Sequence, residues 1–174
     1  LRRPLEIPSD VELVHVSPPS QPGLIDRRLT WDDLEWIREI SDLPVVLKGV
    51  LHPSDAAIAA ELGVEAVIVS NHGGRQLDGV VSAYDVLDQI VTVAGGRLEV
   101  FADGGIRSGS DLIKVLALGA RAGLVGRPVW WSLAAAGGAG VAKMIELLTT
   151  DLEESMRMCG QRDVAEIGGD ILFQ

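Results

Sequence analysis

An internal repeat restricts the fold of this chain more than any other feature of the sequence. The string Leu62-Gly63-x-x-Ala66-x-x-Val69 recurs 56 residues later as Leu118-Gly119-x-x-Ala122-x-x-Val125. At the same offset, Ser54-Asp55 recurs as Ser110-Asp111, and Lys48-Gly49-Val50 corresponds to Gly104-Gly105-Ile106. Such self-similarity predicts a structure in which one supersecondary unit is used repeatedly.

Each copy of the repeat holds two strand–helix units. Apolar runs predict strands at 44–50, 66–70, 99–102 and 122–125, and the first two of these are expected to be buried on both faces. Ser/Thr-x-x-Asp signatures at Thr30, Ser82 and Ser108 predict helix starts, and Pro128 suits the first turn of a helix. Strands that alternate with helices indicate a parallel sheet with helices outside it.

Two units in 56 residues give about 28 residues per unit, the size found in a (β/α)₈ barrel of roughly 250 residues. We therefore predict an α/β fold in which four βα units form half of a TIM barrel. A free-standing four-stranded Rossmann-like sheet is the structural alternative. It is disfavoured because glycine-rich strings follow the strands repeatedly rather than at a single switch point.

Composition bounds the organisation and the partners. Of eight prolines, five fall before residue 30, which predicts an exposed lead-in loop over residues 1–29 and the half barrel over residues 30–174. The net charge of −10 disfavours nucleic acid as a partner. A single cysteine, Cys159, excludes an internal disulfide and favours a reducing, cytoplasmic location. No apolar run reaches the about 20 residues of a spanning helix, so no membrane partner is expected.

Chemistry-bearing residues follow each predicted strand, and in a barrel these strand ends share one mouth. Gly104, Gly105 and Arg107 follow the third strand, and Gly126 and Arg127 follow the fourth. Adjacent glycines let backbone N–H groups approach an anion, a helix N-terminus follows, and the arginines add charge. The two loops together predict a phosphate site, although tight turns alone would also use glycine.

Acid–base chemistry is expected at the loop after the second strand. His72 can take a proton near neutral pH, and Arg75 could clamp a carboxylate. Lys48 ends an apolar strand and needs an anionic partner there, either a carboxylate or a charge that develops in a reaction. Asp103 is expected to bond a ligand hydroxyl or to cap its turn. No metal site is predicted. His15 and His52 are read as structural or solvent-exposed, and Trp130 and Trp131 as core or interface residues.

Four strings carry a family resemblance: Lys48-Gly49, Ser70-Asn71-His72-Gly73-Gly74-Arg75-Gln76-Leu77-Asp78, Asp103-Gly104-Gly105-Ile106-Arg107-Ser108-Gly109 and Gly126-Arg127-Pro128. From about Thr30 onward the chain resembles the C-terminal half of the FMN-dependent α-hydroxy-acid oxidases and dehydrogenases, such as glycolate, lactate and 4-hydroxymandelate oxidases and mandelate dehydrogenase. The resemblance implies FMN as cofactor and oxidation of a small 2-hydroxy acid to the 2-oxo acid.

The resemblance also implies individual roles. His72 would be the catalytic base, Arg75 would bind the substrate carboxylate, and Lys48 would stabilise the reduced flavin. Ser70 and Gly73 would line the flavin ring site, and Asp103 would hold the ribityl hydroxyls. The phosphate would be held by Gly104, Gly105, Arg107, Gly126 and Arg127. Asp78 could replace the carboxylate partner of the base that the family supplies from its other half.

The first half of the family's barrel has no counterpart in this sequence. The expected partners are therefore the 2-hydroxy acid, the N-terminal half of the same enzyme as a second chain or missing segment, and further copies in a homo-oligomer. Two other functions stay open. One is a non-catalytic or self-associating half barrel that binds a phosphorylated ligand. The other is a different FMN or phosphate barrel, of the inosine-monophosphate-dehydrogenase or type 2 isopentenyl-diphosphate-isomerase kind. That dehydrogenase uses a loop cysteine, whereas Cys159 falls near the end of the last predicted helix.

Overall fold

A computed structural model describes residues 29–173 of the chain. The chain divides into two compact units, Leu1–Leu43 and Pro44–Gln174. The first unit contains helix α1 (Asp33–Ile40). The Thr30 backbone N–H donates to Asp33 Oδ2 at 2.6 Å, which confirms the predicted helix-start pair. The lead-in predicted for residues 1–29 lies, apart from Leu29, outside the described residues, and the boundary at residue 30 stays a prediction.

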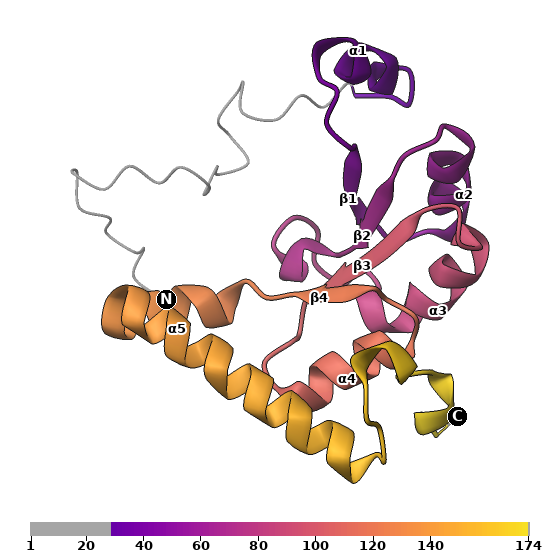
Figure 1. The fold of residues 1–174 in the computed structure, drawn as a ribbon. Coiled ribbons are helices and arrows are strands. Elements are labelled where there is room, and N and C mark those ends of the chain that lie inside the picture. The colour runs from indigo at the N-terminus through magenta and orange to yellow at the C-terminus, as the bar shows by residue number, and fades with distance from the viewer. Residues whose placement is uncertain (1–28, 174) are drawn as a thin grey trace, which may run out of the picture. The chain divides into compact units, whose positions relative to one another are not determined.

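The second unit is built on a four-stranded parallel sheet (Figure 1). Strands β1 (Val46–Val50), β2 (Ala66–Val69), β3 (Glu99–Asp103) and β4 (Ala122–Leu124) lie in sequence order. Helices α2 (Pro53–Glu61), α3 (Ala83–Ala94) and α4 (Gly109–Ala117) connect them. The order contains no reversal, so the sheet lacks the switch point that the Rossmann-like alternative requires.

Helix α5 (Arg127–Met158) follows β4 and packs against α4 (Figure 1). Pro128 occupies its first turn, as predicted. The helix consists of two helical segments joined at a kink, where Ala136 has φ −151° and Gly137 has φ 59°. The second angle is left-handed, and glycine adopts it at little cost. Short 3₁₀ turns η1 (His72–Gly74), η2 (Val164–Glu166) and η3 (Gly169–Ile171) complete the unit.

The backbone geometry confirms the 56-residue repeat. Leu62 and Leu118 end α2 and α4 with φ −77° and −76°, and both have ψ 0°. Gly63 and Gly119 follow with φ 70° and 97°, so each helix is followed by a left-handed glycine. The glycine recurs because each unit must turn its chain sharply from a helix toward the next strand.

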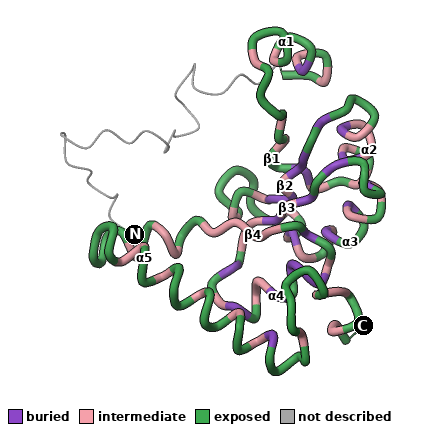
Figure 2. The backbone as a smooth tube through the Cα atoms, in the orientation of Figure 1, coloured by how far each residue is buried: buried purple, intermediate pink, exposed green. Residues whose placement is uncertain are grey.

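The core lies between the sheet and its connecting helices (Figure 2). Val67 and Val100 are register neighbours and are 0% and 5% exposed. The prediction that both of the first two strands are buried on both faces is wrong for β1, where Val46 is 46% exposed. Strand β1 is an edge strand of the described sheet. It has one neighbouring strand, β2, and its side chains are therefore less covered than those of the inner strands.

Candidate active site

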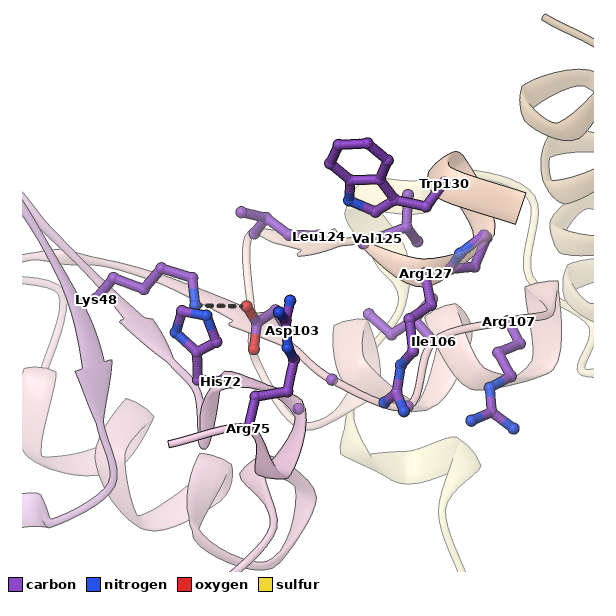
Figure 3. A pocket seen from close by; sticks show the side chains of 15 residues that line it. Lys48, His72, Arg75, Asp103, Ile106, Arg107, Leu124, Val125, Arg127 and Trp130 are labelled. Atoms are coloured by element: carbon purple, nitrogen blue, oxygen red, sulfur yellow. Dashed lines mark ion pairs between the residues drawn. The ribbon is translucent and has the colours of Figure 1, made fainter. Parts of the chain in front are cut away.

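A pocket of about 330 Å³ lies at the carboxyl ends of the strands. Its lining includes every residue that the sequence predicts for the site except Ser70: Lys48, His72, Gly73, Arg75, Asp103, Gly104, Gly105, Arg107, Gly126 and Arg127. In Figure 3, Lys48, His72 and Arg75 lie toward one end of the pocket, and Arg107 and Arg127 lie toward the other. Residues from the four strands and the loops that follow them, distant in sequence, thus meet around one space.

Lys48, in the middle of β1, is held by residues at the carboxyl ends of β2 and β3. Its Nζ lies 2.8 Å from Asp103 Oδ2 and donates to Ser70 Oγ at 2.9 Å. Ser70 is 1% exposed and lies beneath the pocket rather than in its lining. The same Ser70 oxygen accepts the backbone N–H of His72 at 2.9 Å. A buried hydroxyl therefore joins the amine of Lys48 to the backbone of His72.

His72 has a left-handed backbone, with φ 57°, and it is the one non-glycine residue of the described chain with positive φ. Such a conformation is uncommon for a side chain with a Cβ and is concentrated at functional sites. The imidazole is exposed at the pocket, and Arg75 is exposed one turn further on. Asp78 accepts the N–H of Gly79 at 2.9 Å, and no bond joins it to His72.

The other end of the pocket carries unused hydrogen-bond donors. Within residues 29–173, the backbone N–H groups of Gly105, Ile106, Gly126 and Arg127 have no acceptor. In the same range, neither Arg107 nor Arg127 has a carboxylate within salt-bridge distance. Four free N–H groups and two unpaired guanidinium groups around a cavity are suited to a phosphate group.

Two carboxylates already occupy the beginning of α4. Asp111 Oδ2 accepts the N–H of Arg107 at 3.0 Å, and Asp151 Oδ2 accepts the N–H of Gly109 at 2.6 Å. These N–H groups are therefore not available to a ligand, in contrast to the simple expectation that the helix after each glycine-rich loop offers its N-terminus. The donors that stay free belong to the loop after β3 and to the beginning of α5.

Asp103 has one buried carboxylate oxygen that is free to accept a hydrogen bond from a ligand. Its Oδ2 is paired with Lys48, whereas its Oδ1 is buried and has no partner within the described chain. A buried acceptor without a donor costs about 1–3 kcal/mol, so it is rare unless something else satisfies it. A ligand hydroxyl would supply such a donor, and the ribityl chain of FMN carries hydroxyls beside its phosphate. The chemistry of these residues therefore fits FMN.

Several residues around the pocket were not identified from the sequence. Trp130, expected in the core or an interface, is 65% exposed and lines the pocket. Tyr84, at the beginning of α3, supports the loop after β3, because a Cβ on Gly105 would lie 3.5 Å from Tyr84 Cε2. The Ser-x-x-Asp signature at Ser108 located Asp111 as a helix cap, but nothing in the sequence indicated Asp151.

Tyr84 and Asp111 have shifted pKa values. Burial, followed by the nearby charge of Asp111, raises the pKa of Tyr84 to about 12. Burial acts to raise the pKa of Asp111 as well. Hydrogen bonds from the Ser108 hydroxyl and from backbone N–H groups, together with the charge of Lys114, outweigh burial and lower that pKa. The Tyr84 hydroxyl also donates to the Asp111 carbonyl oxygen at 3.3 Å, so the two residues join α3 to α4.

The raised pKa of Tyr84 predicts a loss of stability at alkaline pH. Because the folded state holds its phenol proton from the ordinary value of 10.0 up to about 12, the unfolded state binds fewer protons across that window. The free energy of unfolding should therefore fall between those two pH values. Tyr84 is the only tyrosine, so tyrosinate absorbance reports its pKa directly. Tyr84→Phe should flatten this part of the pH dependence, and equal slopes in both proteins would contradict the assignment.

Two other kinds of feature are absent from the described residues. Across residues 29–173, no three His, Cys, Asp or Glu side chains are grouped in a way that could hold a metal ion. In that same range, none of the helices combines the length and apolar character needed to cross a membrane.

A parallel sheet whose strands lie in sequence order, with a pocket at their carboxyl ends, is the arrangement found in part of a TIM barrel. The chain belongs to the FMN-dependent dehydrogenase family, whose sequence model matches residues 15–174. It is 52% identical to an L-lactate oxidase from Nostoc sp. over 83% of this chain and 40% of that protein. It is 44% identical to 2-hydroxyacid oxidase 2 from Bos taurus over 92% of this chain and 46% of that protein.

Solved structures confirm the predicted fold class. A mandelate oxidase with (S)-2-phenylpropionate is 50% identical and matches with a TM-score of 0.76, over 79% of this chain and 41% of the other. A further mandelate oxidase structure, which contains a monooxide FMN adduct, matches over 44% of its own chain. The chain thus spans less than half the length of these relatives. The family resemblance and the half-barrel prediction are both confirmed.

Proposed function

We propose that this chain forms the flavin- and substrate-binding half of an enzyme that oxidises a small 2-hydroxy acid to the 2-oxo acid with FMN. The observation that carries the proposal is the pocket itself, in which an exposed histidine and arginine face a lysine–carboxylate pair next to unpaired phosphate donors. Membership of an FMN-dependent family supports the choice of flavin. When bound, FMN accepts the two electrons of the oxidation.

The residues at the cationic end would hold the phosphate and the ribityl chain. Arg127 and Arg107 would supply the charge, together with the backbone N–H groups of Gly105 and Gly126. Gly104 has φ 92°, and a Cβ there would lie 3.7 Å from Asn71 Oδ1, so glycine lets this loop turn close to its neighbour. The unpartnered Asp103 Oδ1 would accept a ribityl hydroxyl, which removes the cost of its burial.

The residues at the other end would bind and deprotonate the substrate. Arg75 would clamp the carboxylate with two parallel hydrogen bonds, and the His72 imidazole would take the hydroxyl proton. Lys48, held by Asp103 and Ser70, would place a fixed positive charge at the edge of the flavin ring. Ser70 would hold the Lys48 amine beside this ring site, and Gly73, which lines the pocket, would border it.

The activity would require a second half barrel. In the described sheet, β1 and β4 each have one neighbouring strand, and an unpaired strand edge normally has to be covered. The relatives are more than twice as long as the matched region. We propose that four further βα units, in the same polypeptide or a second one, close the barrel, that the enzyme is a homo-oligomer, and that it acts in the cytoplasm.

A second candidate function is a non-catalytic half barrel that binds a phosphorylated ligand. It is favoured by one observation, namely that the free phosphate donors all come from this chain, whereas His72 and Arg75 are exposed. The two functions differ in their prediction for turnover. Flavin binding without oxidation of any 2-hydroxy acid, even when the missing half is supplied, would favour the binding protein.

Flavin binding by an Arg127 variant tests the proposal directly. Arg127→Leu should weaken FMN binding by about 10- to 100-fold, because a charged hydrogen bond contributes about 1.5–3 kcal/mol. Binding of riboflavin, which lacks the phosphate, should change little. Arg121→Leu is the matched control, since Arg121 lies at the start of β4 and 3.9 Å from Glu99. Titration of flavin fluorescence gives both dissociation constants, and equal losses for the two flavins would contradict the phosphate site.

A further inference from the structure

Arg107 is a cation whose backbone is fixed and whose side chain has no acidic partner in the described chain. Its backbone N–H is held by Asp111 Oδ2 at 3.0 Å, and its side chain lines the pocket. Arginine has a long side chain that loses conformational freedom when it binds a ligand. An arginine that is already directed toward its ligand loses less, and so binds more tightly.

Trp131 supplies such a constraint. The Arg107 guanidinium carbon lies over the Trp131 ring, 5.8 Å from its centre, which is within range of a cation–π interaction. The ring is 55% exposed, so burial in the core does not account for its position. Trp131 does not line the pocket, whereas its neighbour Trp130 does. The beginning of α5 thus provides Arg127 for the pocket and an aromatic surface for Arg107.

We propose that Trp131 is a positioning residue, which holds the Arg107 guanidinium toward the phosphate and thereby increases the preference for FMN over riboflavin. The inference rests on the proposed function, because it assumes that FMN occupies the pocket. It goes further in assigning part of the phosphate specificity to a residue outside the pocket. A residue that acts only through Arg107 should change FMN binding alone and should have no effect when Arg107 is absent.

The test measures the dissociation constants of FMN and riboflavin for the full chain and for variants. Trp131→Leu should lower the preference for FMN about two- to fivefold, the size of an exposed cation–π interaction. Trp131→Phe keeps an aromatic face and should restore most of that preference. Trp36→Leu is the matched control. It removes a ring of similar exposure, 57%, that neither lines the pocket nor lies over Arg107, and it should leave the ratio of the two affinities unchanged.

A double-mutant cycle completes the test. In an Arg107→Leu background, Trp131→Leu should cause no further loss of FMN preference, because the interaction that it removes is already absent. An unchanged preference in Trp131→Leu, or the same loss with and without Arg107, would overturn the inference while the proposed function stands. A wild-type chain that binds neither flavin would overturn the proposed function, and this inference with it.

Discussion

Replacing His72 by alanine should lower the oxidation of a 2-hydroxy acid by about 10²- to 10⁴-fold, the range of a general base, while FMN still binds. The imidazole is exposed at one end of the pocket, and the phosphate donors lie at the other, so its loss leaves the donors intact. Stability should change little, because exposed substitutions usually cost less than about 0.5 kcal/mol. The measurement is the initial rate of the flavin-loaded enzyme with its complete barrel.

His52→Ala is the matched control for this prediction. His52 precedes α2, and its Nδ1 accepts the N–H of Ser54 at 3.2 Å, so it caps a helix and does not line the pocket. The control should cost about 1 kcal/mol of stability, as a lost cap does, and retain turnover. Retained turnover in His72→Ala would remove His72 from the mechanism. A loss of FMN binding in that variant would instead show that the residue holds the cofactor.

Replacing Gly109 by alanine should destabilise the protein by about 3 kcal/mol or more, because it overfills a tightly packed contact. A Cβ at this position would lie 2.1 Å from Leu152 N and 2.2 Å from the Asp151 carbonyl carbon. Both atoms belong to the backbone of α5, so no side-chain rotation can make room. Separating α4 from α5 would also break the Gly109–Asp151 hydrogen bond of 2.6 Å. The free energy of unfolding in urea measures the effect.

Gly138→Ala is the control for Gly109→Ala. It makes the same chemical change in α5, but a Cβ there would meet nothing within 4 Å. Alanine is the better helix former, so this variant should be as stable as the wild type or about 0.5–1 kcal/mol more stable. Equal stabilities for the two variants would mean that α4 and α5 do not pack as closely as described. The loop that carries Arg107 begins α4, so Gly109→Ala should also weaken FMN binding.

The sequence best predicted the features that depend on the backbone preference of one residue or on a bond between residues close in sequence. Gly63 and Gly119 mark the same turn twice because only glycine adopts a left-handed backbone easily there. Ser108 and Asp111 predicted a helix start because their bond, 2.7 Å between Ser108 Oγ and Asp111 Oδ2, spans three residues. The strand ends predicted the pocket because parallel strands all present their carboxyl ends at one edge.

Burial was harder to predict, because it depends on which elements pack together. The apolar run of β1 indicated a strand but not that its Val46 would be exposed. Trp130 was expected in the core or an interface, as a large aromatic side chain often is, but it lines the pocket. An apolar residue is buried only if another element covers it, and periodicity within one segment does not identify that element.

By itself, the sequence determined the repeating βα units, their order and the residues at each strand end, because these follow from local backbone preferences and spacing. Only the tertiary structure decided which donors stay free. At the beginning of α4, the N–H groups of Arg107 and Gly109 are bonded to Asp111 and to Asp151, which is 42 residues from Gly109. At the beginning of α5, the corresponding N–H groups have no acceptor in the described chain. The tertiary structure also joined Lys48 to Asp103 and to the buried Ser70. Such bonds depend on how helices and strands distant in sequence pack, and that packing sets where charge and hydrogen-bonding capacity remain for a ligand.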